Sequence, residues 1–111
     1  MREDPAMTTR PDRRHRRHRV VTVLFDGMTA FEPAIASEVF GLERRDELGR
    51  PWYRHTFCTE HPGRVAVRGA PDVFVDDGLD AVRRADTVIV PSNDHSPGGA
   101  SPAVLDALRA A

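Results

Sequence analysis

The sequence has 111 residues and a mass of 12.3 kDa, which limits it to one small domain and excludes two-domain enzymes, β/α barrels and long repeat arrays. Hydrophobic residues make up 40% of the chain and charged residues 30%, and the formal net charge is -1. This small charge hides an asymmetry, because residues 1–19 carry seven Arg against three acidic residues, whereas residues 20–111 carry nine against fourteen. An acidic globular part therefore follows a basic N-terminal segment.

Cysteine content and hydropathy restrict the class of protein further. The single cysteine, Cys58, excludes both an internal disulfide framework and a zinc cluster built on cysteines. No apolar run approaches the roughly 20 residues that span a bilayer. The arginine-rich N-terminus lacks the apolar core of a secretory signal. We therefore expect a cytoplasmic protein without a membrane segment.

The basic segment, residues 1–19, has no apolar periodicity, and we predict that it is a disordered tail. Its arginines could bind nucleic-acid phosphates. Alternatively, the segment could be a solvated leader, with the real start of translation at Met7 or a later codon. His15 and His18 have a spacing that suits a metal ion on a helix, but the flanking arginines repel cations. No metal site is predicted there or elsewhere in the chain.

The globular part begins with a strand and a helix. Residues 20–25, VVTVLF, form an apolar β-branched run that is typical of a strand buried on both faces. A helical period follows, with Thr29 as the predicted N-cap, Glu32 completing a capping box, Pro33 in the first turn, and an end near Gly41. One apolar face of this helix consists of Phe31, Ile35, Val39 and Leu42.

The later elements alternate between strands and helices. Residues 43–51 are polar and predict a surface loop, and residues 78–85 predict a short helix. Further strands are predicted at 52–59, at 64–68 and 73–75 as a hairpin, and at 87–91.

The last predicted helix begins after Ser101, which we expect to be its N-cap. Its apolar stripe consists of Val104, Leu105 and Leu108. The order of elements indicates an α/β fold with a doubly wound, mainly parallel sheet between two helical layers and right-handed crossovers. Such a sheet would contain about three parallel strands with one edge open. We therefore interpret residues 20–111 as a partial domain, incomplete at its C-terminus.

Three segments carry a resemblance to a known family: VVTVLFDGMTAFEPAIASEVFGLER, PWYRHTFCTE and GAPDVFVDDGLDAVRRADTVIVPS. Over roughly residues 18–111 the chain resembles the N-terminal sensor domain of GlxA-type transcriptional regulators. These AraC family proteins carry a ThiJ/PfpI domain, which is class I glutamine amidotransferase-like, ahead of two helix-turn-helix motifs. The resemblance implies a flavodoxin-like α/β sandwich, usually dimeric, that senses a small molecule.

The family pattern also contains elements that this sequence does not match. Relatives continue into a strand and a nucleophile elbow, often with a cysteine, then a histidine and the DNA-binding helices. Cys58 falls in the predicted strand 52–59 and does not match the elbow cysteine. His55 lies three residues before it, which places the two side chains on opposite faces of a strand. We therefore assign no catalytic residue and expect a truncated regulator without a helix-turn-helix of its own.

The candidate ligand-binding residues follow the predicted strands. Glu32, in the motif AFEP, matches a carboxylate that ThiJ/PfpI enzymes place near their nucleophile, although a structural role in the capping box explains it better. Ser92 and Asn93 replace the Gly-Gly that forms an oxyanion hole in the enzymes of this family. Because ligands of open α/β sheets bind outside the carboxyl ends of the strands, we predict a ligand site there. Its residues would be Asp26, Glu32, Ser92, Asn93 and His95, the last as a donor or as a solvated loop residue.

The function most consistent with these observations is the ligand-sensing and dimerisation part of an AraC-type regulator. The alternative is a fragment of a ThiJ/PfpI-type hydrolase or glyoxalase-like enzyme, and a third hypothesis is nucleic-acid binding through the tail. We expect no cofactor, because the chain has neither a GxGxxG motif nor any lysine for a phosphate-binding loop. The expected partners are a small-molecule effector and a second copy of the chain, without a membrane or a helix-turn-helix contact to DNA.

Overall fold

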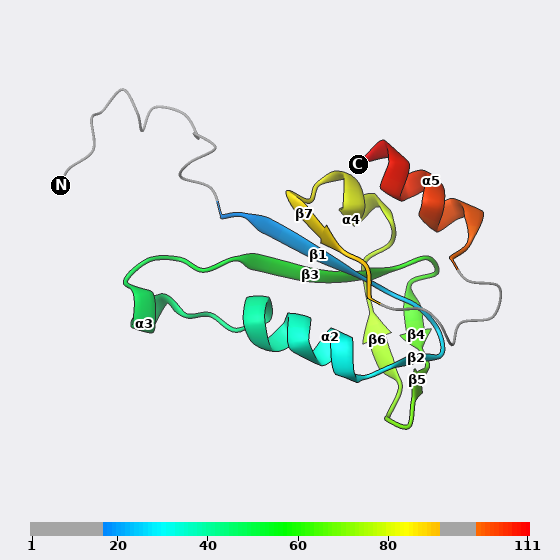
Figure 1. The fold of residues 1–111 in the computed structure, drawn as a ribbon, viewed down its shortest axis with the longest axis horizontal. Helices are drawn as coiled ribbons and strands as arrows, with labels where there is room; N and C mark the ends of the chain where they lie inside the picture. The colour runs from blue at the N-terminus through cyan, green and yellow to red at the C-terminus, as the bar shows by residue number, and fades with distance from the viewer. Residues whose placement is uncertain (1–16, 92–99) are drawn as a thin grey trace.

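The computed structural model describes residues 17–91 and 100–111 and shows an α/β fold around a parallel sheet (Figure 1). The sheet has the strand order β3-β1-β7, which confirms the prediction of three parallel strands. Its strands are β1 (Arg19–Leu24), β3 (Arg54–Thr59) and β7 (Thr87–Ile89). Residues 1–16 of the predicted tail lie outside the described residues.

The central strand β1 is buried on both faces, as its continuous apolar sequence predicts. Every residue from Val20 to Leu24 is less than 5% exposed. β1 pairs with β3 along its whole length, from Arg19 opposite Arg54 to Leu24 opposite Thr59. A strand enclosed on both sides needs apolar side chains at successive positions, which is the pattern seen here.

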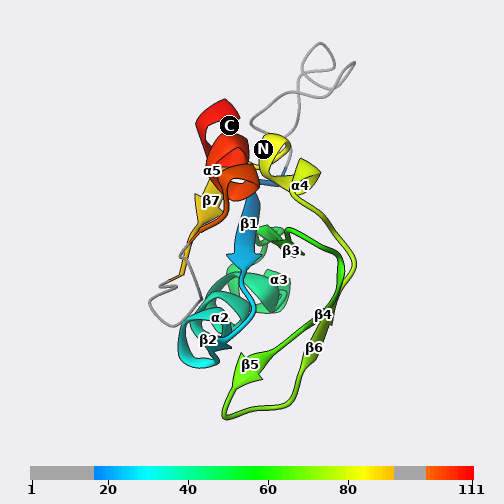
Figure 2. The ribbon, with the colours of Figure 1, turned by 90° about the vertical axis from the view of Figure 1, so that its right-hand side faces the viewer.

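Helices cover both faces of this sheet and complete three layers (Figures 1 and 2). On one face lies α2 (Phe31–Ala36), which continues as a π-helical turn, η2 (Ser37–Gly41). On the other face lie α4 (Asp80–Arg83) and α5 (Pro102–Ala110), which contact each other. None of the helices in the described parts of the chain is both long enough and apolar enough to cross a membrane.

Two small strand pairs extend from the carboxyl end of the sheet. The strand β4 (Gly63–Val65) pairs antiparallel with β6 (Val73–Val75), whereas β5 (Val67–Arg68) pairs in parallel with β2 (Met28–Thr29). The predicted antiparallel pairing with residues 73–75 is therefore confirmed for β4 but not for β5, which pairs with β2 instead. The predicted strand 64–68 divides at Ala66, because its backbone bonds to the turn that follows β1.

The structure also corrects the prediction of a loop at residues 43–51. A one-turn helix, α3 (Arg45–Leu48), lies within this segment and ends before Gly49, which has a positive φ of 72°. Positive φ is readily adopted by glycine, which explains the stop. The ion pair between Arg44 and Glu47 spans the turn at 3.4 Å, a spacing favourable in helices.

The start of α2 differs from its prediction, because no capping box forms. Thr29 belongs to β2, where its backbone pairs with Arg68, so it cannot also begin the helix. Ala30 is the N-cap and offers no side-chain acceptor. By contrast, the predicted cap of the last helix is confirmed, since Ser101 Oγ accepts a hydrogen bond of 3.2 Å from the N–H of Val104.

The apolar stripe predicted for α2 does not face the core. Its four members are all exposed, by 42–74%: Phe31 74%, Ile35 46%, Val39 42% and Leu42 47%. The helix packs on the sheet through the adjacent face, where Ala36 is buried and Ser37 and Phe40 are half-buried. The small side chains of Ala36 and Ser37 let the helix approach the strands closely at this point, whereas Phe31, Ile35, Val39 and Leu42 remain outside.

The core lies between the sheet and the helical layers, and it combines strands with α4 and α5. Val82 of α4 and Val104 of α5 are almost fully buried, and Leu108 packs against the same cluster. Leu105 was predicted in this stripe, but it is 38% exposed. The buried apolar residues are Val20, Val21, Val23, Leu24, Phe25, Met28, Ala36, Cys58, Val65, Val75, Ala81, Val82 and Val104.

Candidate ligand-binding groove

The turn that follows β1 is held by the neighbouring strand pairs. Gly27 has a φ of 83°, and its N–H donates a 2.8 Å hydrogen bond to the carbonyl of Ala66. In return, the Asp26 carboxylate accepts a 2.8 Å hydrogen bond from the N–H of Ala66. Asp26 therefore lies at the carboxyl end of β1, as predicted, and it also has a structural role there.

Glu32 lies in the first turn of α2, one short strand further along the chain than Asp26. Its side chain is exposed, and a carboxylate in this position is favoured by the positive end of the helix dipole. The structure thus places both residues in the segment that leaves the carboxyl end of β1. Ser92, Asn93 and His95, the other predicted site residues, lie outside the described residues. Pro91, just before them, is buried beyond the end of β7.

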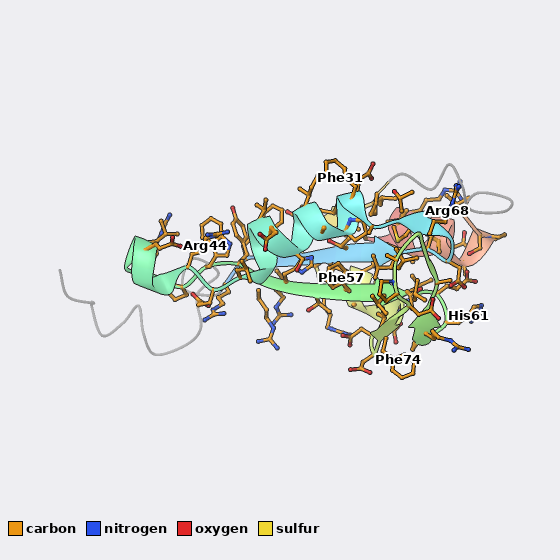
Figure 3. The ribbon with its side chains drawn as sticks, turned by 90° about the horizontal axis from the view of Figure 1, so that it is seen from below. Phe31, Arg44, Phe57, His61, Arg68 and Phe74 are labelled. Carbon is orange, nitrogen blue, oxygen red and sulfur yellow. The ribbon has the colours of Figure 1, made fainter. Side chains whose placement is uncertain are left out.

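A groove of about 360 Å³ opens between α2 and the extension formed by β5 and β6. Figure 3 shows Phe31 and Phe74 projecting from opposite edges of this face, with Phe57 between them. Phe57 lines the groove from β3, Ala34 lines it from α2, and Phe74 lines it from β6. The complete lining is almost entirely apolar: Leu24, Met28, Ala30, Pro33, Ala34, Ser37, Phe57, Val67, Ala70, Pro71, Val73, Phe74 and Val75.

The groove has the size and chemistry of a site for a small, largely apolar molecule. Ligand pockets typically measure about 300–1,000 Å³ and combine apolar walls with a few polar groups. Ser37 supplies the hydroxyl in this lining, and Leu24 places the groove at the carboxyl end of β1. Asp26 and Glu32 do not line it. The groove therefore lies at the strand end where the ligand site is predicted, but different residues form its lining, and the predicted site stays a prediction.

A signal for the groove was present in the sequence at Val73 and Phe74. These neighbouring apolar residues are both exposed, by 40% and 80%, on a strand that has only one partner. Adjacent residues of a strand point to opposite faces, so an apolar pair gives both faces of the strand an apolar surface that can contact another part of the protein or a ligand. The wall formed by α2 gives no such signal, because it depends on how the helix sits on the sheet.

Behind the groove, His55 is held between the sheet and η2. Its Nε2 atom lies 2.8 Å from Thr22 Oγ1, and its ring contacts the rings of Phe57 and Phe40 at centroid distances of 4.5 Å and 6.5 Å. Burial lowers the pKa of His55 below its ordinary value, because the apolar surroundings disfavour the charged ring. The imidazole is therefore neutral at physiological pH.

Cys58 lies on the other face of the sheet, as the strand period predicts. It is fully buried, pairs in register with Val23 and forms a bridge to Asp77. Burial, and secondarily the negative charge of Asp77, raise the pKa of the Cys58 thiol to about 11. The thiol is therefore protonated at neutral pH and faces away from His55, so these two residues do not form a nucleophile–base pair.

The fold defined by these elements is of the flavodoxin-like α/β type found in the DJ-1 superfamily. Among solved structures, the chain is similar to a DJ-1 superfamily protein from Agrobacterium tumefaciens, with a TM-score of 0.56 and 21% sequence identity. The match covers 83% of this chain and 48% of that protein, so the chain spans about half the length of its structural neighbour. Neither a protein-family model nor a curated protein matches the sequence.

Proposed function

We propose that this chain is the effector-sensing and dimerisation part of an AraC-type transcriptional regulator, with a small apolar effector bound in the groove. The observation that carries the proposal is that α2 and η2 line the groove on one side and expose apolar side chains on another. Ala34 and Ser37 form one wall of the groove, whereas Phe31, Ile35 and Val39 form an exposed apolar stripe on the same continuous helix.

The exposed stripe fits self-association. Its members follow one another at helical spacing, so they form a single surface along α2 and η2. Contiguous exposed apolar surface of this kind typically marks an interaction site. A second copy of the chain is the partner that the proposal requires, because a dimer would place two such helices against each other.

The shared helix supplies the coupling that a sensor needs. A ligand shifts an equilibrium only when it has different affinities for the two states. An effector that occupies the groove contacts α2 directly, so a shift of this helix alters the stripe on its outer surface. Effector binding and dimerisation are then linked, and each affects the other by the same free energy.

The first experiment measures self-association of the full chain by sedimentation velocity. Replacing Phe31 and Ile35 together by Glu places charges in the proposed interface, and we expect the dimer to weaken by at least about tenfold. Leu105→Glu is the matched control, since Leu105 is an exposed leucine on α5 and not on the stripe. A wild-type chain that stays monomeric at about 100 µM, a concentration at which micromolar complexes form, contradicts the proposal.

The second experiment tests sensing in a bacterial reporter. The full chain is fused to a DNA-binding module that represses only as a dimer, and a panel of small apolar metabolites is added to the cells. We expect a subset to change repression, and we expect Ala34→Phe to abolish that response by filling the groove. Ala103→Phe, an equally large change at an exposed position of α5, serves as the control. A response that persists in Ala34→Phe would contradict binding of the effector in the groove.

The buried, protonated thiol of Cys58 favours sensing over the hydrolase or glyoxalase-like alternative. A cysteine nucleophile acts as a thiolate and needs an accessible position. We expect no turnover of methylglyoxal or of p-nitrophenyl acetate above the buffer rate. Turnover that Cys58→Ala abolishes would establish the enzymatic alternative instead.

A further inference from the structure

A second groove, of about 440 Å³, lies on the opposite face of the sheet and is lined by arginines. Arg19 and Arg54 are the first residues of β1 and β3, and they are direct register partners. Neighbouring strands are about 4.8 Å apart, so these two arginines start side by side. Arg84 joins them from the end of α4, because it lines the same groove.

The guanidinium groups of these three arginines are not paired with acidic side chains in the described parts of the chain. Within residues 17–91 and 100–111, none of the three forms an ion pair, whereas four other arginines do. The paired arginines are Arg17 with Glu43, Arg44 with Glu47, Arg64 with Asp72 and Arg109 with Asp106. The arginines of the groove therefore keep their hydrogen-bonding capacity for a ligand.

The rest of the lining defines the charge and shape of the site. Asp77 contributes a negative charge, so the lining has a net charge of about plus two. The register pair two positions further along the strands, Val21 and Thr56, lines the same groove, with a hydroxyl on Thr56 and a methyl surface on Val21. Ala81 of α4 completes an apolar wall.

We propose that this groove binds a small molecule that carries a phosphate dianion. The guanidinium fork matches phosphate oxygens in pairs, and the forks of two neighbouring arginines, with that of Arg84 in the same lining, can together hold one phosphate group. The net positive charge of the lining balances a dianion. Asp77 and Thr56 can bond hydroxyl groups of the remainder of the molecule.

This site is separate from the apolar groove. Arg19 and Arg54 lie at the amino ends of their strands and on the α4 face, whereas the apolar groove lies at the carboxyl end and on the α2 face. The two sites therefore do not share a residue. Failure of either proposal leaves the other unaffected.

The test measures binding of glycerol 3-phosphate to the full chain by isothermal titration calorimetry, with glycerol as the neutral comparison, at about 150 mM salt to screen distant charges. We expect saturable binding of the phosphate ester only. Arg54→Gln and Arg84→Gln should each weaken it by at least about tenfold, the usual effect of losing a charge-assisted hydrogen bond. Arg83→Gln is the control, because it removes the same charge from the same helix outside this groove.

The basic N-terminal segment needs its own control because it can attract phosphate without a built site. Because the proposal assigns the affinity to Arg19, Arg54 and Arg84, a variant with Arg10, Arg13, Arg14 and Arg16 changed to Gln should bind glycerol 3-phosphate within about twofold of wild type. Loss of binding in this variant, with binding retained in Arg54→Gln, would overturn the proposal. Absence of saturable binding, or equal weakening by Arg83→Gln, would overturn it too.

A measurement without substitutions covers the case in which a groove variant fails to fold. Titration of wild-type chain with glycerol 3-phosphate should shift the backbone amide NMR signals of Arg19, Arg54 and Ala81. Shifts confined to other residues would overturn the assignment. Binding of an oligonucleotide to the same variants is measured in parallel, to distinguish a small-molecule site from a nucleic-acid site. Groove variants that weaken oligonucleotide binding but not glycerol 3-phosphate binding would also contradict the proposal.

Discussion

The carboxylate of Asp26 accepts a 2.8 Å hydrogen bond from the backbone N–H of Ala66, which ties the turn after β1 to the segment between β4 and β5. The adjacent Gly27 N–H donates to the carbonyl of the same residue at 2.8 Å. Ala66 thus has both backbone groups paired with consecutive residues of the turn. This contact positions the extension that forms one wall of the apolar groove.

Asp26→Ala should therefore lower the free energy of unfolding by about 1 kcal/mol, because it leaves the N–H of Ala66 without this acceptor. Asp26→Asn keeps an acceptor oxygen and should therefore lower the free energy of unfolding by a smaller amount. Urea denaturation followed by circular dichroism measures both effects. Amide exchange at Ala66 should quicken in the alanine variant, and unchanged exchange there would show that the contact contributes nothing to local stability.

His55 should make the stability of the protein depend on pH. Its unfolded pKa is about 6.5, and burial lowers its pKa in the folded state. Between these two values the unfolded chain binds more protons, so stability is full above about pH 6.5 and falls as the pH decreases through the folded pKa. Urea midpoints at a series of pH values from about 7 downward should show this decline.

His55→Gln removes the titrating group and should flatten this decline. His61→Gln is the matched control, because the His61 side chain is 89% exposed and lies beside Glu60 on the surface. It should leave most of the decline in place. If the decline persists in His55→Gln and disappears in His61→Gln, the pH dependence comes from His61, and the prediction is contradicted.

Cys58 should react slowly with thiol reagents in the folded protein. A pKa of about 11 leaves few thiolates at pH 8, and the side chain is fully buried. Labelling with a disulfide reagent should therefore be at least about a hundredfold slower than in guanidinium chloride, where the same chain supplies the control. Equal rates in both states would mean that the strand opens readily or that the thiol is accessible.

The sequence by itself determined the central sheet. The apolar run at 20–25 specified a strand enclosed on both faces, and the order of strands and helices specified parallel pairing and two helical layers. It also determined the cap at Ser101, since a helix start is a local signal. These features depend on neighbouring residues or on a period that the chain itself carries.

Only the tertiary structure decided which surfaces are available to ligands. Phe31 and Ile35 belong to an apolar face of α2, but the sheet packs against the face of Ala36, because a helix that is apolar on two sides can bury either. The pairing of Arg19 with Arg54, and the meeting of Ala34 with Phe74 across a groove, join residues far apart in the sequence. Register and helix placement set these contacts, and no local pattern encodes them.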